Sequence, residues 1–211
     1  MANEVSSNTK KRLPFYLEYL NKIKNEGQLN ISSKAIAIAM NLGEVQVRKD
    51  LAAVSSGGKP KIGYEVDALI KDLEDYLGYK DTDDAVLFGA GKLGLALLDY
   101  PGFYECGFNI IAGFDVDKKK QGLSESGKQI FDNSKFPSFN KKHKAKIGIL
   151  CVPDSKAQEV CNFMIENGIE AILNFAQAHL IVPDNVIIKS ENLAYSLALL
   201  SIEMKAKQHK M

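Results

Sequence analysis

A glycine-rich turn between a predicted strand and a predicted helix constrains the fold of this chain more than any other feature. The apolar run 85–88 leads directly into Gly89, Ala90, Gly91, Lys92, Leu93 and Gly94, and a helical stretch follows. A second apolar run, 108–114, ends at Asp115, twenty-one residues after Gly94. This order of strand, GxGxxG turn, helix, strand and acidic residue is typical of a dinucleotide-binding βαβ unit.

Three more apolar runs follow at 146–152, 170–175 and 186–189. They are mostly unbroken, as the strands of a parallel sheet covered on both faces should be. The sequence therefore predicts an α/β fold, a doubly wound Rossmann sheet, over residues 85–190.

Each glycine of the turn has a distinct expected role. Gly89 permits the tight turn, Gly91 lets a pyrophosphate approach the backbone, and Gly94 allows the helix to pack closely on the strand. Asp115 should accept hydrogen bonds from the adenine ribose and repel a 2′-phosphate, which favours NADH and NAD⁺ over the phosphorylated forms. The alternatives are a turn that binds nothing and a site for a CoA-type nucleotide.

Two later strand ends should border the nicotinamide half of the cofactor, since ligands of open α/β sheets lie across the carboxyl ends of the strands. They carry Val152 and Pro153 after one strand, and Asn174 and Phe175 after the next. Alternatively, Val152 and Pro153 only terminate a strand, and Asn174 only caps its turn.

The first 80 residues have the pattern of helices and turns that is typical of a winged helix-turn-helix domain. Apolar residues at helical spacing predict a helix from about Leu13 to Gly27, with Pro14 in its first turn. Ser32 or Ser33 can cap a second helix, and a tight turn at 42–43 leads into a third over 44–54. The glycine-rich stretch 55–66 reads as a β-hairpin wing, and a fourth helix is expected over 66–77.

This segment also carries the chain's basic excess. Residues 1–64 hold ten Lys and Arg against five Asp and Glu, including the only two arginines, Arg12 and Arg48. On the third helix Arg48 and Gln46 can read base edges while Lys49 neutralises phosphate, and Lys59 and Lys61 can extend the contact from the wing. A winged helix that binds a protein instead is the alternative.

Catalysis and membrane insertion are not expected. Of the three histidines only His179 could approach a cofactor, and no residues remain for a separate substrate domain. The alternative is a small NAD- or CoA-binding enzyme or subunit with an accessory winged helix. The chain has no apolar run of about 18 residues and no signal peptide, which predicts a cytoplasmic protein. Three cysteines without paired spacing are interpreted as buried thiols rather than a redox pair or a metal site.

The C-terminal segment 191–211 should mediate self-association. Its predicted helix, 192–207, is apolar nearly all round, with Leu193, Leu197, Leu200 and Met204 on one side and further apolar residues on another. Such a helix must be buried on two faces, and a helix at the end of a chain is well placed to lie between two subunits.

Taken together, several motifs resemble the Rex family of redox-sensing transcriptional repressors. They are QVRKDL at 46–51, GY at 63–64, the GxGxxG turn with DYPGF at 99–103, FDVD at 114–117, VP at 152–153 and ILNF at 172–175. The resemblance implies a homodimer with an exchanged C-terminal helix that binds palindromic operator DNA and releases it on binding NADH, with NAD⁺ competing.

The resemblance also bears on individual residues. It places the cofactor at the glycine turn and Asp115, with Tyr100 nearby, and DNA at Arg48 and Lys49; we add Arg12 and Ser33 to the expected DNA contacts. The chain departs from the family pattern at Val54 and Ser55 after the third helix. It departs again at Asn192 and Leu193, where an Asp and often a Phe are expected opposite Tyr100.

Overall fold

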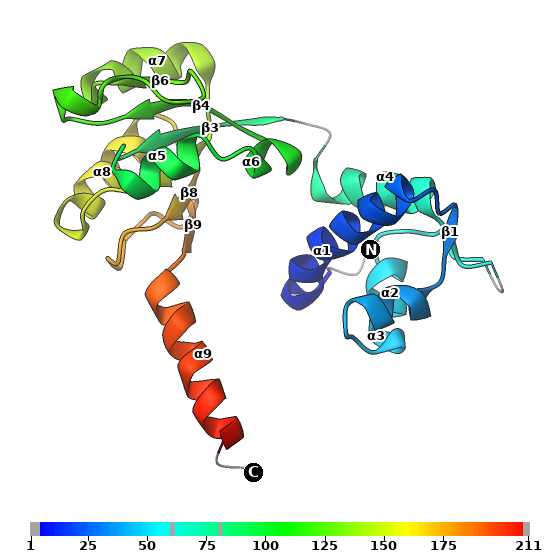
Figure 1. Ribbon diagram of the computed structural model, residues 1–211. Coiled ribbons are helices and arrows are strands. Elements are labelled where there is room, and N and C mark those ends of the chain that lie inside the picture. The colour runs from blue at the N-terminus through cyan, green and yellow to red at the C-terminus, as the bar shows by residue number, and fades with distance from the viewer. Residues whose placement is uncertain (1–4, 60–61, 80–81, 209–211) are drawn as a thin grey trace. The chain divides into compact units, whose positions relative to one another are not determined.

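The computed structural model describes residues 5–59, 62–79 and 82–208 (Figure 1). The chain divides into two compact units, Met1–Asp81 and Thr82–Met211. None of the helices within the described ranges has the length and apolar character that a membrane span requires.

The N-terminal unit consists of four helices and two short strands. In chain order these are α1 (Ser7–Asn25), β1 (Asn30–Ile31), α2 (Ser33–Ala39), α3 (Glu44–Ala52), β2 (Tyr64–Glu65) and α4 (Val66–Leu77). The apolar faces of α1 and α4 pack together around a core that includes Leu13, Leu20 and Leu69. The predicted bounds of α4 are confirmed.

The start of α1 differs from the prediction. The helix begins at Ser7, capped by the side chain of Ser6, which accepts a hydrogen bond from the backbone N–H of Thr9. Pro14 therefore lies inside the helix, and its placement in the first turn was wrong. The cap residue outweighs the proline as a start signal because it satisfies a free N–H group of the first turn.

The helix-turn-helix follows the predicted order with one difference in the turn. Ser32 caps α2 by accepting from the N–H of Ala35, so it is the cap of the two candidates. The residue in the left-handed conformation is Asn41, at φ 53°, whereas Gly43 is extended and forms the N-cap of α3. Asparagine tolerates this conformation better than most residues with a side chain.

The predicted wing is not an isolated hairpin, because its last strand pairs with a strand outside the wing. Its last strand, β2, pairs antiparallel with β1, matching Asn30 to Glu65 and Ile31 to Tyr64. A single bridge between Lys59 and Gly63 closes the loop. Pro60 and Lys61 lie outside the described residues. The predicted DNA contact at Lys61 therefore has no structural description.

The C-terminal unit is a seven-stranded sheet with helices on both faces (Figure 1). The strands are β3 (Asp83–Phe88), β4 (Phe108–Phe114), β5 (Gly122–Leu123), β6 (Gln129–Phe131), β7 (Ile147–Leu150), β8 (Ala171–Asn174) and β9 (Ile187–Ser190). The helices are α5 (Lys92–Leu98), α6 (Gly102–Glu105), α7 (Phe136–His143), α8 (Asp154–Glu166) and α9 (Leu193–Gln208), with 3₁₀ turns η1 (Lys118–Lys120) and η2 (Asn133–Lys135).

The sheet order is β5-β6-β4-β3-β7-β8-β9, and every pairing is parallel except that of β5. The chain begins the parallel sheet at β3, moves outward through β4 and β6, and returns to place β7 on the other side of β3. The strand order therefore reverses between β3 and β7, where an open α/β sheet binds its ligand. The predicted doubly wound α/β class is confirmed.

Both faces of this sheet are buried. On one face Phe88, Phe114 and Phe136 pack with ring centroids 4.8–5.1 Å apart. On the other, Leu87, Leu98 and Ile110 form a second core cluster. The two clusters hold β3 and β4 rigidly, and the candidate site lies at the ends of these strands.

Candidate functional site

The glycine turn has the geometry that its sequence predicts. Gly89 follows β3 directly with φ 96°, and its N–H donates to the carbonyl of Phe114 at 2.8 Å. A side chain at Gly89 would collide with the carbonyl of Cys151, and one at Gly94 would collide with the carbonyl of Gly89. Only glycine fits at these two positions. Because neither residue has a side chain, β3, β7 and α5 can approach one another closely at the turn.

Asp115 directly follows β4 and ties the glycine turn to the end of that strand. Its carboxylate is buried, accepts from the backbone N–H of Ala90 and of Asp117 at 2.8 Å each, and pairs with Lys120 Nζ at 3.2 Å. The carboxylate therefore fixes the turn and the following loop as well as facing the site.

A cavity of about 750 Å³ lies at this edge of the sheet. It is bordered by the predicted residues Gly89, Gly91, Asp115, Val152 and Pro153, which come from the ends of three neighbouring strands. The structure thus brings together residues up to 64 positions apart in the sequence, as the parallel topology requires.

Several predicted cofactor residues do not line the cavity. Ala90 donates its N–H to Asp115, and Gly94 packs against the carbonyl of Gly89, so both hold the turn without lining the cavity. Lys92 and Leu93 are exposed on the first turn of α5. Tyr100 is 55% exposed and stacks edge-on against Phe103.

The last two predicted cofactor residues, Asn174 and Phe175, also lie outside the cavity lining. Asn174 is fully buried. Its side-chain amide donates hydrogen bonds to the Ser190 hydroxyl and the Ala178 carbonyl, and its oxygen accepts one from the N–H of Ala176. These contacts correspond to the alternative interpretation, in which Asn174 holds its own turn. Phe175 packs against the second core cluster.

Sequence reasoning missed other residues that line the cavity. They are Phe114, Val116, Asp117, Lys120, Asn133, Cys151, Lys156, Glu159 and Val160. The residues just after Asp115 could have been found from their position at a strand end. Asn133 could not, because the strand before it, β6, has only three residues and no clear apolar run.

The three cysteines do not share one environment. Burial raises the pKa of Cys151, in the cavity wall, to about 12, which keeps its thiol neutral. Cys161 is buried, as expected, whereas Cys106 and Cys151 are partly exposed, so the interpretation as buried thiols was wrong for those two. Within the described ranges, no three His, Cys, Asp or Glu side chains are grouped so that they could hold a metal ion.

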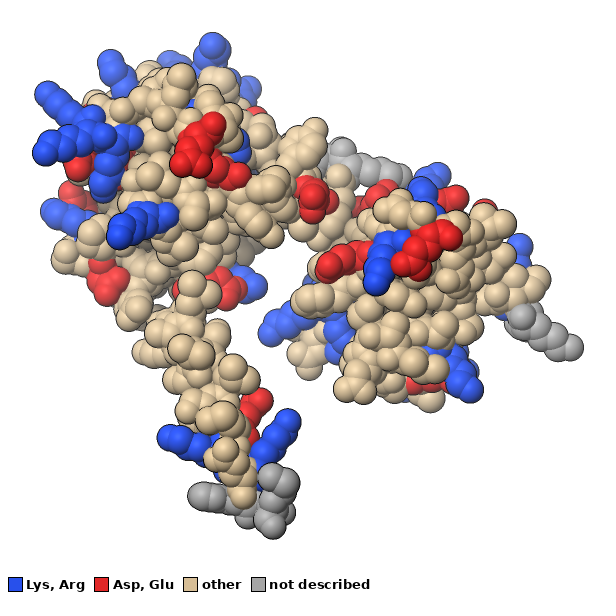
Figure 2. Space-filling model, viewed as in Figure 1, with Lys and Arg blue, Asp and Glu red and all other residues tan. Residues whose placement is uncertain are grey.

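The second candidate site lies on α3 and the wing. Val47 and Leu51 are buried against the core, whereas Gln46, Arg48 and Lys49 are exposed. A separate cavity of about 480 Å³ is lined by residues of α2, α3 and the wing, including Ser33, Arg48, Lys59 and Tyr64. In Figure 2 basic side chains are spread over both units, so this local grouping, rather than overall charge, marks the face.

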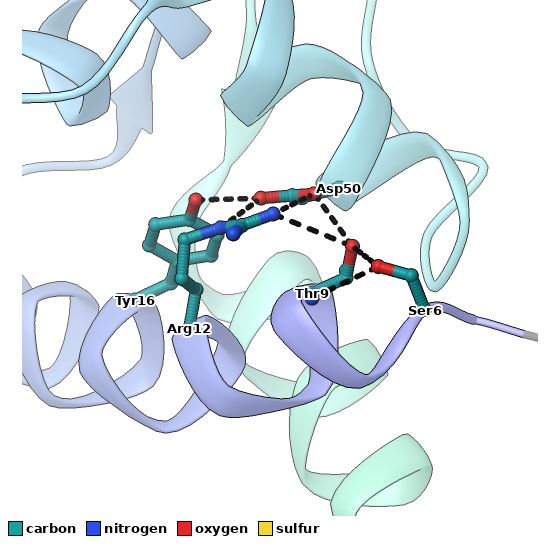
Figure 3. A network of polar contacts seen from close by, with 5 residues as sticks. All are labelled: Ser6, Thr9, Arg12, Tyr16 and Asp50. Carbon is teal, nitrogen blue, oxygen red and sulfur yellow. Dashed lines mark hydrogen bonds and ion pairs between the residues drawn. The ribbon is translucent and has the colours of Figure 1, made fainter.

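A buried polar network holds α3 against α1 (Figure 3). The carboxylate of Asp50 accepts from Arg12 Nε and Nη2 at 2.7 and 2.8 Å, from the Tyr16 hydroxyl at 2.8 Å and from the Thr9 hydroxyl at 2.9 Å. Ser6 bonds Thr9 in turn. Arg12 was expected to contact DNA, but its guanidinium is engaged here, so the structure indicates a scaffolding role.

The network shifts the ionisation of its members. Burial raises the pKa of the Asp50 carboxyl, but the hydrogen bonds from Arg12, Tyr16 and Thr9 outweigh burial and hold that pKa below its usual value. Burial, followed by the hydrogen bond to Asp50, raises the pKa of Tyr16 from 10.0 to about 12. The folded state thus favours an ionised Asp50 and a neutral Tyr16.

These shifts predict how stability depends on pH. Because the folded pKa of Tyr16 is raised, its contribution is complete below pH 10 and is lost as the pH rises from 10 to about 12. The contribution of Asp50 is present near neutral pH and is lost in acid as the pH falls through its lowered pKa. We expect Tyr16→Phe to reduce the alkaline loss, measured by denaturant unfolding at several pH values. Tyr64 is also shifted upward by burial, so the test is the difference between the two proteins. Equal alkaline losses would contradict the assignment.

Comparisons with known proteins cover both sites. A family model described as "Putative DNA-binding protein N-terminus" matches residues 4–52, and one described as "CoA binding domain" matches residues 80–178. A curated relative from Treponema denticola, the redox-sensing transcriptional repressor Rex, is 40% identical over 94% of this chain and 94% of its own.

Solved structures match over nearly the whole chain. The structure of RSP in complex with β-NAD⁺ and operator DNA is 33% identical, has a TM-score of 0.90, and is matched over 97% of this chain and 94% of its own. The structure of RSP in complex with β-NADH is 32% identical, has a TM-score of 0.85, and is matched over 98% and 97% of the two chains.

Proposed function

Because the chain belongs to the Rex family of redox-sensing transcriptional repressors, we propose that its N-terminal unit binds operator DNA and releases it when NADH occupies the cavity of its C-terminal unit. The protein is a DNA-binding repressor and not an enzyme. One observation carries the proposal: a single chain combines a glycine-turn cavity with an exposed basic helix of a winged-helix unit.

For the cofactor, we propose that NADH and NAD⁺ lie across the carboxyl ends of β4, β3 and β7. The backbone of the glycine turn, including Gly89 and Gly91, would hold the pyrophosphate, and Asp115 the adenine ribose. Val152 and Pro153 would border the nicotinamide half. Their positions around one cavity support this order.

For DNA, we propose that α3 enters the major groove. Gln46 and Arg48 would contact base edges and Lys49 a phosphate, while Ser33 and Lys59 would contact the backbone beside the groove. The exposure of Gln46, Arg48 and Lys49 on α3 supports this arrangement. Ser33, Arg48 and Lys59 also line one cavity. A repressor of this kind would act where its operator lies, in the cytoplasm.

We further propose a homodimer formed through α9. No residue of this helix is buried. Leu197, Leu200 and Ile202 are 61–68% exposed although their side chains are apolar. Figure 2 shows its first turns without charge and charged side chains only near its C-terminal end. An exposed apolar surface of this kind is expected to be covered by another protein surface. A second copy of the chain would cover it and would also present two α3 helices to the two half-sites of a palindrome.

The proposal is tested by fluorescence anisotropy with a labelled palindromic duplex. The protein should bind the duplex, NADH should release it, and NAD⁺ should oppose that release. A complex that is unaffected by NADH would contradict the proposal. A protein that binds no palindromic duplex from its genome's fermentative and respiratory promoters would also contradict it.

Removing the Asp115 carboxylate should weaken NADH binding. In Asp115→Ala the ribose loses a charged acceptor worth about 1.5–3 kcal/mol, and Ala90 loses its anchor, so affinity should fall about tenfold to a hundredfold. Lys120 loses its partner and becomes available to a 2′-phosphate, so the preference for NADH over NADPH should shrink. Titration calorimetry with both nucleotides measures this. Glu170→Ala is the control, because Glu170 is exposed, pairs with Lys146 and does not line the cavity, so both affinities should stay unchanged. Preference of the unaltered protein for NADPH would show that the role of Asp115 is wrong.

Arg48→Ala should separate the two functions. Loss of one base or phosphate contact costs about 1–3 kcal/mol, so operator affinity should fall about tenfold to a hundredfold while NADH affinity stays unchanged. Anisotropy and calorimetry measure the two affinities. Lys22→Ala removes an exposed charge from the last turn of α1 and should change neither. Normal operator binding by Arg48→Ala would exclude α3 from the proposed role.

A further inference from the structure

The wall of the 750 Å³ cavity at the glycine turn, the nucleotide cavity, contains a polar side chain with an unpaired atom, that of Asn133. Asn133 begins η2, immediately beyond Asp132 at the end of β6. Its Oδ1 atom is buried and has no hydrogen-bond partner among the described residues. Buried polar atoms are nearly always paired, so an unpaired acceptor on a residue that lines a cavity indicates a missing donor.

The sheet order says which part of a dinucleotide this acceptor would meet. Along the carboxyl edge, Asn133 follows β6, Asp115 ends β4, Gly89 follows β3 and Val152 follows β7, in the same order as the strands lie. With the pyrophosphate on the glycine turn and the ribose on Asp115, the base attached to that ribose extends toward β6. Asn133 is therefore the lining residue at the β6 end of the cavity, on the side toward which the base would extend.

The surroundings of Asn133 suit a flat aromatic base. It lines the nucleotide cavity and also an adjoining cavity of about 520 Å³, and Val116 and Val160 line both. Their side chains offer apolar contact to the faces of a ring, while the amide offers hydrogen bonds to its edge. An asparagine amide can accept from the 6-amino group of adenine and donate to N7 of the ring at the same time. Hypoxanthine presents acceptors at both of these positions, so neither orientation of the amide satisfies both.

We propose that Asn133 is a specificity-determining residue that reads the 6-amino group of the adenine ring. The inference rests on the proposed function, since it assumes that the cavity holds NADH. Hypoxanthine carries a carbonyl oxygen at position 6, which would face the Oδ1 atom of Asn133 as a second acceptor. The protein therefore distinguishes NADH from deamino-NADH, its hypoxanthine analogue.

The test compares these two nucleotides by titration calorimetry with the full-length protein. Deamino-NADH should bind about tenfold to a hundredfold more weakly than NADH, the usual discrimination of a two-point amide contact. Asn133→Leu keeps a side chain of similar shape without hydrogen-bonding groups, so the ratio of the two affinities should fall close to one. Asn162→Ala is the matched control, because Asn162 lines only the adjoining cavity; it should retain the full ratio.

The outcomes distinguish a failure of the Asn133 proposal from a failure of the proposed NADH-responsive function. If the unaltered protein binds both nucleotides equally, the inference is wrong and the proposed function stands. If it discriminates and Asn133→Leu discriminates equally well, another residue reads the base. If it binds neither nucleotide, the proposed function itself fails. Since the first comparison needs no variant, a poorly folded Asn133→Leu would not block the test.

Discussion

Asp50→Ala should unfold the N-terminal unit at a much lower denaturant concentration than the unaltered protein. The substitution removes the common acceptor of Arg12, Tyr16 and Thr9 and leaves the partly buried guanidinium of Arg12 without its partner. Removing one partner of a fully buried ion pair costs about 3–5 kcal/mol and breaking an exposed pair about 0–1 kcal/mol, so this partly buried pair should cost about 2–3 kcal/mol. That is a large part of the roughly 5–15 kcal/mol that stabilises a typical domain. Operator binding should fall with it, because Asp50 lies on the helix that we propose enters the groove.

This effect is measured by urea unfolding followed by circular dichroism, together with NADH titration. NADH affinity should be unchanged, because the network lies wholly within the N-terminal unit. Asp67→Ala is the matched control: it breaks an exposed ion pair to Lys24 and should cost less than about 1 kcal/mol. If Asp50→Ala unfolds at the same urea concentration as Asp67→Ala, the network contributes little to stability.

Leu197→Asp should abolish the dimer at micromolar concentration. In the proposed dimer both copies of α9 lose a buried leucine, at about 1.5–3 kcal/mol each, and two carboxylates would be buried as well. The dimer dissociation constant should therefore rise at least a hundredfold. Binding to a palindrome should weaken in parallel, since one subunit contacts only one half-site.

Analytical ultracentrifugation and anisotropy follow these two changes. Lys207→Asp places the same charge in the last turn of α9, beyond its apolar stretch, and should leave the dimer intact. Leu200→Asp should behave like Leu197→Asp if both sides of the helix are covered. A Leu197→Asp protein that stays dimeric would remove α9 from the interface.

Strands of four or more residues could be predicted from the sequence, and the two- and three-residue strands of the large sheet could not. The bounds of α4 follow from its helical apolar periodicity and those of β4 from its apolar run. β5 and β6 hold two and three residues, too few to show a pattern, and they were missed. Because Asn133 follows β6, missing that strand concealed the outer end of the nucleotide cavity.

The candidate site was predictable where a backbone requirement restricts the residue type. Gly89 and Gly94 stand where a side chain would collide with backbone carbonyls, and such requirements are visible in a sequence. The pairing of Arg12 with Asp50 joins residues 38 positions apart and depends on how two helices pack. Sequence alone assigned this arginine to DNA because its charge was visible and its partner was not.

Redox sensing by this protein requires coupling between the nucleotide site and the DNA site. If NADH favours a dimer whose recognition helices no longer match two half-sites, operator DNA must weaken NADH binding by the same factor, because linkage is reciprocal. The decisive measurement is NADH affinity by calorimetry, with and without saturating operator duplex. We expect NADH to bind about 5- to 150-fold more weakly in the presence of the operator, a coupling of about 1–3 kcal/mol. Equal affinities in the two titrations would contradict redox sensing by this protein.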